Sequence, residues 1–136
     1  MKRIFLDANV LFTAAHNPNG KAALLIELGN QGHWEICTSV YAMEEAMRNI
    51  EIKYPASRDA LARIVKNINL VRRYSEHPCP DGLNEKDKPI FQAAAECSAT
   101  HLLTGDIKNF GRYMNRTDKT FNIRIQTVAD FYKENL

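Results

Sequence analysis

The stretch Ile4-Phe5-Leu6-Asp7 combines three consecutive apolar residues with an acid at their end. Three adjacent apolar residues are typical of a strand that is buried on both faces, as strands of parallel sheets are. The stretch Leu102-Leu103-Thr104-Gly105-Asp106 has the same form. Ligands of open α/β sheets bind at the carboxyl ends of the strands. We therefore expect Asp7 and Asp106 to lie at a binding edge.

Strands and helices are expected to alternate along the chain. A short helix should begin near Ala8, and apolar residues at helical spacing predict further helices near 21–30, 40–52, 60–68, 86–97 and after Thr127. In the 40–52 helix this spacing predicts a buried face of Val40, Met43, Met47 and Ile50. Short strands are expected at 34–39, 70–71, 101–104 and 123–125, and a loop at 75–84. The alternation predicts an α/β fold, a three-layer α/β/α sandwich with a central, mainly parallel sheet.

Size and composition point to an ordinary globular protein. With 136 residues the chain is expected to form a single domain over residues 1–136. The contents of 45% hydrophobic and 25% charged residues exclude a disordered or fibrous chain. The net charge of +2 identifies no partner, but residues 108–124 carry five basic residues against the single acid Asp118. Such a basic face is suited to phosphates.

The cysteines and the N-terminus bear on the location of the protein. Cys37, Cys79 and Cys97 are widely spaced and form no Cys-x-x-Cys pair, which favours a reducing, cytoplasmic setting. The apolar stretch behind Met1-Lys2-Arg3 ends at Asp7, too early for a signal peptide. No run approaches the ~20 apolar residues of a membrane span, so no membrane association is expected.

Two further acidic positions accompany Asp7 and Asp106. Glu44 and Glu45 lie on the predicted 40–52 helix, and Asp87 lies near the start of the 86–97 helix. Mg²⁺ and Mn²⁺ prefer oxygen ligands, often one or two carboxylates together with waters and substrate phosphates. Crowded carboxylates repel one another, so a bound cation relieves that repulsion. Together the acids predict a metal-dependent nuclease site.

The four motifs resemble those of the PIN-domain nucleases over nearly the whole chain. Asp7-Ala8-Asn9-Val10-Leu11 is similar to the opening motif of that family, and Glu45-Ala46-Met47-Arg48 is similar to its second acidic motif. Asp87 followed by Ile90 matches the third, and Thr104-Gly105-Asp106 with the downstream Phe110 resembles the Thr-Gly-Asp signature. Each motif alone is weak, but four in order are fairly specific.

The resemblance implies a PIN-like three-layer fold and a divalent-metal-dependent endoribonuclease that cuts single-stranded RNA with a metal-activated water. The catalytic residues it implies are Asp7, Glu45, Asp87 and Asp106, of which Asp7, Asp87 and Asp106 would hold Mg²⁺ or Mn²⁺. The supporting residues are Asn9, Thr104 and Asn109. Many small relatives are toxins of toxin-antitoxin pairs, so a cognate antitoxin and a second copy of the chain are candidate partners.

One position departs from the family pattern. Some members place a further Asp just beyond the Thr-Gly-Asp motif, where this chain has Asn109. A second-metal or water contact would then be weaker, although the amide still offers a neutral carbonyl oxygen.

Each site residue also has a purely structural explanation. Asp7 is suited to cap a helix, Asp106 to a turn, Asp87 to the positive end of its helix, and Asn9 to a helix start. Adjacent helical residues point about 100° apart, so only one of Glu44 and Glu45 can face the site. The family pattern favours Glu45, and Glu44 is placed to pair with Arg48.

A group of basic residues is interpreted equally well as an RNA-binding surface or as an ordinary solvated surface. These candidate RNA-binding residues are Arg48, Lys108, Arg112 and Arg116. The four histidines have no paired ligand spacing, which argues against a zinc site.

Two other functions compete with the nuclease. The first is a noncatalytic PIN-fold module that binds RNA or a protein, which the neutral Asn109 would suit. The second is a phosphoacceptor fold with Asp7 as nucleophile. Its phosphatase version is disfavoured, because those enzymes usually carry a second Asp where this chain has Asn9.

Overall fold

A five-stranded, all-parallel sheet forms the centre of the structure, a computed structural model that describes residues 1–73 and 75–136. The strands lie in the order β3-β2-β1-β4-β5. Their bounds are Arg3–Leu6 (β1), Glu35–Ser39 (β2), Asn69–Val71 (β3), His101–Leu103 (β4) and Arg124–Gln126 (β5). The predicted α/β class and the mainly parallel sheet are confirmed.

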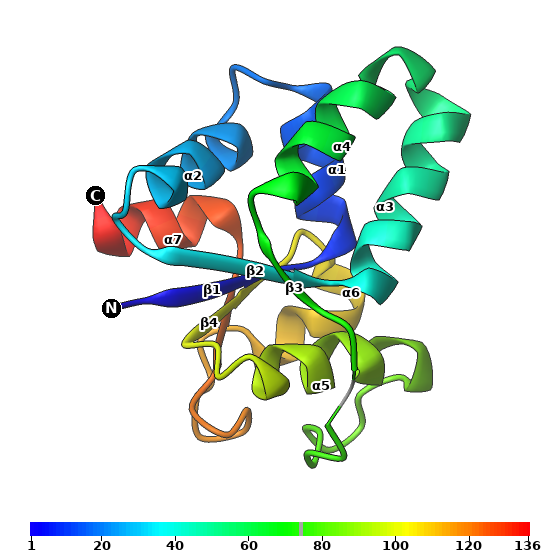
Figure 1. The fold of residues 1–136 in the computed structure, drawn as a ribbon. Helices are drawn as coiled ribbons and strands as arrows, with labels where there is room; N and C mark the ends of the chain where they lie inside the picture. The colour runs from blue at the N-terminus through cyan, green and yellow to red at the C-terminus, as the bar shows by residue number, and fades with distance from the viewer. Residues whose placement is uncertain (74) are drawn as a thin grey trace.

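Helices cover both faces of this sheet. In Figure 1 the helices α1 to α4 and α7 lie above the strands, and α5 lies below them. The α-helices are Ala8–His16 (α1), Lys21–Asn30 (α2), Val40–Lys53 (α3), Arg58–Lys66 (α4), Lys88–Glu96 (α5), Ile107–Phe110 (α6) and Val128–Asn135 (α7). Short 3-10 helices span Pro55–Ser57 (η1), Glu85–Asp87 (η2) and Gly111–Tyr113 (η3). None of the helices in the described part of the chain is long and apolar enough to cross a bilayer.

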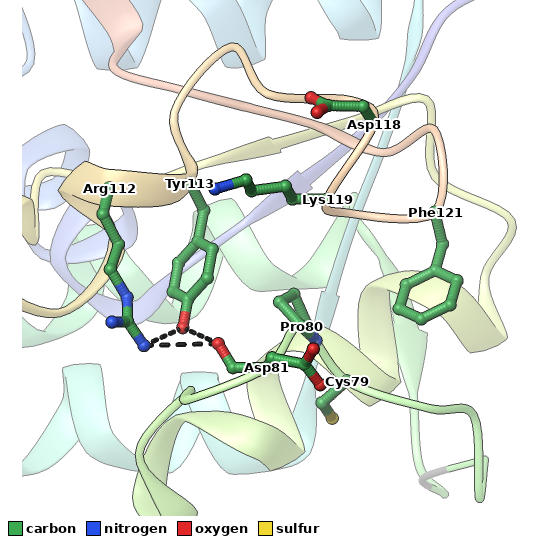
Figure 2. A pocket seen from close by; sticks show the side chains of 8 residues that line it. All are labelled: Cys79, Pro80, Asp81, Arg112, Tyr113, Asp118, Lys119 and Phe121. Carbon is green, nitrogen blue, oxygen red and sulfur yellow. Dashed lines mark hydrogen bonds between the residues drawn. The ribbon is translucent and has the colours of Figure 1, made fainter.

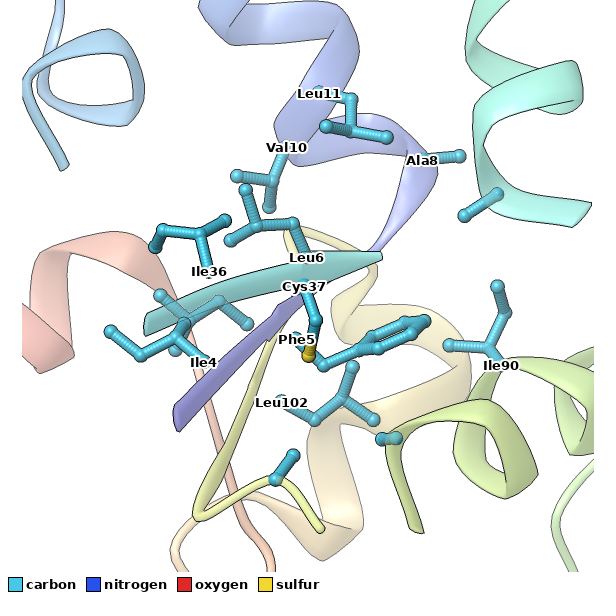
Figure 3. Packing of buried hydrophobic residues seen from close by; sticks show 14 of the residues in the cluster. Ile4, Phe5, Leu6, Ala8, Val10, Leu11, Ile36, Cys37, Ile90 and Leu102 are labelled. Atoms are coloured by element: carbon cyan, nitrogen blue, oxygen red, sulfur yellow. The ribbon is translucent and has the colours of Figure 1, made fainter. Parts of the chain in front are cut away.

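Strand β1 is the central strand and is covered on both faces. Ile4, Phe5 and Leu6 are all fully buried. In Figure 3 Phe5 points toward Ile90 of α5, whereas Leu6 points toward Val10 on α1. Successive residues of a strand face opposite sides, so an uninterrupted apolar run is what a strand between two helical layers requires.

The strand order places a topological switch between β1 and β4. The chain moves outward from β1 to β2 and β3 and then returns to the other side of β1 as β4. At such a point, neighbouring connections leave the sheet in opposite directions, and a crevice opens at the carboxyl ends of the two strands. Asp7 directly follows β1, and Thr104 directly follows β4.

The buried face of α3 differs from the predicted one. The residues with full burial are Ala42, Ala46 and Ile50, whereas Val40, Met43 and Met47 are only partly buried. Helix α3 packs extensively against α1. Small alanine side chains let two helices approach closely, so the interface selects alanines over the larger side chains that set the apolar pattern.

The segment after β4 is more structured than expected. It forms α6 and η3, which sequence periodicity did not predict because a helix of four residues is too short to show a period. The predicted loop is confirmed over the described residues 75–84, which form no helix or strand.

Candidate functional site

Asp7 lies at the junction of β1 and α1 and is 5% exposed. Its backbone is extended, and its Oδ1 accepts a hydrogen bond of 2.7 Å from the backbone N–H of Ala8. The backbone N–H of Asp7 donates to the carbonyl of Leu103 at 3.1 Å. Asp7 therefore caps the helix, as the structural explanation proposed, and its carboxylate sits at the switch between β1 and β4.

A hydrogen-bond network joins Asp7 to the segment after β4. Thr104 Oγ1 donates to Asp7 Oδ2 at 2.8 Å, and Asn9 Nδ2 lies 3.2 Å from both of these oxygens. Asn9 Oδ1 accepts from the backbone N–H of Gly105 at 2.6 Å. The backbone N–H of Asp106 donates to Thr104 Oγ1 at 3.1 Å. Asn9 and Thr104 thus fix the position of the Asp7 carboxylate.

Asp106 and Asn109 form a second, adjacent network. Asp106 caps α6, because its Oδ1 accepts from the backbone N–H of Asn109 at 3.1 Å. Asn109 Nδ2 donates to Asp106 Oδ2 at 2.8 Å, and its Oδ1 accepts from Asn84 Nδ2 at 2.6 Å. An Asp at position 109 would instead repel Asp106. In this chain the amide orients Asp106 and ties it to the segment that leads into η2.

Asp87 brings an unpaired oxygen to the same region. Its side chain is 8% exposed, and its Oδ2 is buried with no hydrogen-bond partner among the described residues. Buried carboxylate oxygens are normally satisfied, so an unpaired one indicates a missing donor, water or cation. Burial is the main cause that raises the pKa of Asp87, and the negative charge of Asp106 raises it further.

Of the two glutamates, Glu45 is the one directed toward these acids. Glu45 is half-buried and Glu44 is exposed. The charge of Glu45 contributes to the raised pKa of Asp7. Helix α3 is tied to η2 by a hydrogen bond of 3.1 Å from the Tyr41 hydroxyl to the carbonyl of Lys86. In the described residues Glu44 makes no ion pair with Arg48.

The environment of Asp7 disfavours its charged form. The pKa of Asp7 is raised to about 6, mainly by burial and also by the negative charges of Glu45 and Asp87, against the opposing hydrogen bonds from Thr104 and Ala8. The four acids singled out from the sequence therefore act on one another: Glu45 and Asp87 on Asp7, and Asp106 on Asp87. A cation among them would remove this penalty.

The donor set fits a hard cation that retains waters. Within residues 1–73 and 75–136, no group of three or more acidic, His or Cys side chains is arranged to hold a metal ion. Mg²⁺ needs no such group, since it is usually held by one or two carboxylates with waters and phosphate oxygens. Three donors occupy the Asp7 carboxylate, which has about four lone-pair sites and so keeps one for a cation. The unpaired Asp87 Oδ2 is a second available ligand.

A cavity of about 730 Å³ adjoins this edge of the sheet. Asn9, Thr104 and Asp106 line one side of it, and Lys21 and Thr127 line another. Sequence reasoning missed Lys21 and Asn84, because neither belongs to a motif and both reach the site only through the fold.

The candidate RNA-binding residues lie in different settings. Arg48 on α3 and Lys108 on α6 are exposed. One nitrogen of Arg112 donates to the carbonyl of Asp81 at 3.2 Å, and Arg116 pairs with Asp118 at 3.3 Å. Of these four basic residues, Arg112 and Arg116 are held by contacts within the chain, whereas Arg48 and Lys108 have no such hydrogen bond or ion pair among the contacts of the described residues.

Solved structures share this architecture. The chain resembles VapBC2 from Rickettsia felis bound to a DNA fragment from its promoter, with a TM-score of 0.64 and 15% identity over 92% of this chain and 98% of that one. VapC, the toxin of such complexes, is a PIN-domain protein. The chain has the PIN-domain fold.

Two further structures carry the PIN fold over a similar length. VapBC-1 from nontypeable Haemophilus influenzae aligns over 93% of this chain and 98% of that one, with a TM-score of 0.59 and 15% identity. DNA-bound VapBC from Salmonella typhimurium aligns over 94% and 99%, with a TM-score of 0.61 and 16% identity. No protein-family model and no curated protein matches the sequence. At this identity the likeness establishes the PIN fold, and the activity is argued from the site.

The raised pKa of Asp7 predicts a pH dependence of stability. The folded protein keeps the Asp7 proton up to a pH of about 6, whereas the unfolded chain releases it near ~3.9. The protonated Asp7 therefore contributes its full stabilisation at low pH, and this stabilisation is lost as the pH rises from about 4 to about 6. The shift corresponds to about 3 kcal/mol in the free energy of unfolding. In chelator, Asp7→Asn should therefore lose less stability than the wild type between pH 4 and pH 7.

Urea unfolding at a series of pH values measures this difference. The exposed acid Asp59 supplies the matched control, and Asp59→Asn should follow the wild-type curve. Identical pH profiles for the wild type and Asp7→Asn would contradict a raised pKa of Asp7 in the folded protein.

Proposed function

We propose that the chain is a divalent-metal-dependent endoribonuclease that hydrolyses single-stranded RNA. The observation that carries the proposal is the unpaired, buried Oδ2 of Asp87 beside the buried carboxylate of Asp7, at the ligand-binding edge of the sheet. Mutually repelling carboxylates with a free oxygen are expected where a cation binds, and they are unfavourable without one.

In this proposal Asp7, Asp87 and Asp106 would hold Mg²⁺ or Mn²⁺ between them, partly through bound waters. When bound, the ion lowers the pKa of a water and stabilises charge on the phosphate. Thr104 and Asn9 hold the Asp7 carboxylate in one orientation, and Asn109 does the same for Asp106. The half-buried Glu45 would accept a hydrogen bond from the attacking water. No residue of the chain is needed as a nucleophile.

A phosphoacceptor role for Asp7 fits the site less well. A nucleophilic carboxylate needs an oxygen that a phosphoryl group can approach in line. Both oxygens of Asp7 accept hydrogen bonds, and the side chain is 5% exposed.

The basic residues support an RNA substrate. Arg48 lies on α3, which also carries Glu45, and Lys108 lies on α6, which Asp106 caps. Exposed cations beside a metal centre attract and position a phosphate backbone. We propose RNA rather than DNA as the substrate because the sequence motifs resemble those of the PIN-domain nucleases.

We further infer that the chain is the toxin of a toxin-antitoxin pair. The support is the fold shared with VapBC proteins over more than nine-tenths of the chain. A cognate antitoxin is then the expected partner, and a second copy of the chain is another. The three cysteines Cys37, Cys79 and Cys97 are free, in keeping with a cytoplasmic protein.

Cleavage of a mixed pool of single-stranded RNA tests the activity. The wild type should cut with Mg²⁺ or Mn²⁺ and not with chelator, and Asp7→Asn and Asp106→Asn should each reduce the rate by at least ~100-fold, because each removes a metal ligand. Asp59→Asn on α4 is the control and should cut at the wild-type rate. A folded wild type that binds RNA but never cuts it would identify the noncatalytic module instead.

Growth of expressing cells tests the toxin role. Expression of the wild type should slow growth, because RNA cleavage depletes essential transcripts. Asp7→Asn should remove the effect, and Asp59→Asn should retain it. Equal inhibition by the wild type and Asp7→Asn, at matched protein levels, would contradict a toxic nuclease.

A further inference from the structure

A second cavity, of about 420 Å³, lies outside the acidic site. The loop residues Pro80 and Asp81 form one wall, and residues of the 112–121 segment form the other (Figure 2). Figure 2 shows the rings of Tyr113 and Phe121 at its two ends, with the Lys119 side chain between them. We call this cavity the aromatic slot.

The aromatic slot is held open by fixed contacts. The Tyr113 hydroxyl donates to the carbonyl of Asp81 at 2.6 Å, and Arg112 donates to the same carbonyl at 3.2 Å. The Arg112 guanidinium lies 4.8 Å from the centre of the Tyr113 ring. Gly82 has a φ of +81°, and a side chain there would collide with Arg112. The two walls are therefore set before any ligand binds.

Phe121 is unusual in both backbone and exposure. Its φ of 52° lies in the left-handed region, which is unfavourable for a bulky side chain, and yet 48% of the residue is exposed. The turn is fixed by the buried Thr120, whose Oγ1 donates to the carbonyl of Ile123 at 2.6 Å. The ring rests edge-on against His77, with the ring centres 5.1 Å apart. A strained, exposed aromatic residue that is locked in place indicates a ligand contact.

The slot is lined by two basic and two acidic side chains, those of Arg112, Lys119, Asp81 and Asp118, and Lys119 is the cation available to meet an anion. Asp118 pairs with Arg116 at 3.3 Å, which neutralises one acid at the rim of the slot. Lys119 makes no ion pair within the part of the chain that the structure describes. The segment 108–124 as a whole has five basic residues and one acid.

Both walls of the slot continue directly into the acidic site. Arg112 follows Asn109 by three residues, and Asp81 precedes Asn84 by three, so each lies within about 11 Å of the hydrogen-bonded pair Asn84 and Asn109. Asn109 in turn holds Asp106. A single-stranded RNA that is bound at the acidic site can therefore also reach the slot.

We propose that the aromatic slot binds one nucleotide of single-stranded RNA beside the cleavage site, an inference that rests on the proposed nuclease function. The base stacks on Phe121, and Lys119 contacts the phosphate. An exposed ring together with an unpaired cation matches the two parts of a nucleotide, and stacking of this kind accepts any base. The slot would increase the time that RNA spends at the acids without specifying its sequence.

Fluorescence anisotropy with a labelled oligouridine of ten nucleotides tests the slot. Chelator is present throughout, so binding is measured without cleavage. Phe121→Asn should weaken binding by about 5- to 150-fold, the range for loss of one base-aromatic contact. Its melting temperature should change little, because Asn tolerates the left-handed backbone. Phe121→Leu keeps the backbone strain and removes the flat ring, and it should weaken binding too, whereas Phe121→Tyr should retain it.

Further variants test the charge of Lys119 and whether the effect is confined to the slot. Lys119→Ala should make the slope of log affinity against log salt less negative by about 0.7, the value for one phosphate contact with a single strand. Tyr54→Ala, at an aromatic residue with 42% exposure, and Lys66→Ala, at the end of α4, should both bind as the wild type does.

The outcomes separate the slot from the nuclease. Equal affinity of the wild type and the folded Phe121 and Lys119 variants, or no binding by the wild type, would overturn the slot proposal and point to a protein partner there. Slot-dependent binding by a wild type that cuts no RNA would support the slot and contradict the nuclease. Cleavage by a wild type whose slot variants bind normally would contradict the slot alone.

Discussion

The hydrogen bond from Thr104 to the buried carboxylate of Asp7 is the interaction on which the site depends. It joins the end of β1 to the end of β4, the two strands on either side of the topological switch. Because Asn9 and Gly105 complete the same network, the start of α1 and the approach to α6 are fixed together. The fold thus places acids from separate parts of the sequence at one edge.

The clustering of buried acids at this edge is unfavourable for the chain without a bound cation. Burial and neighbouring acids raise the pKa of Asp7 to about 6, and Asp87 keeps an oxygen without a partner. A protein selected for stability alone would replace such acids with amides or apolar residues. At position 109 the chain has an amide, which donates a hydrogen bond to Asp106 where a carboxylate would repel it. We therefore propose that the remaining acids bind a cation.

The sequence predicted the strands and most helices because apolar runs and helical spacing report burial directly. Asp7 and Asp106 were predicted as site residues from their positions after apolar strands, whereas the choice of Glu45 over Glu44 depended on the family resemblance. On the buried face of α3 the prediction of Ile50 was correct, but Val40, Met43 and Met47 are only partly buried, since close packing on α1 selects Ala42 and Ala46, which carry little apolar signal. The contact between Asn84 and Asn109 and the strained Phe121 arise from tertiary structure, which no local pattern encodes.

A crystal of the wild type soaked in Mn²⁺ gives the most direct test of the central claim, that these acids form a metal centre. The anomalous scattering of Mn²⁺ locates the ion independently of any activity. The account predicts a peak in contact with carboxylate oxygens of Asp7 and Asp87, at roughly 2.0–2.6 Å, the range for hard cations and oxygen. A soaked crystal with an intact, accessible site and no peak at these acids, or with its only peak elsewhere, would contradict it.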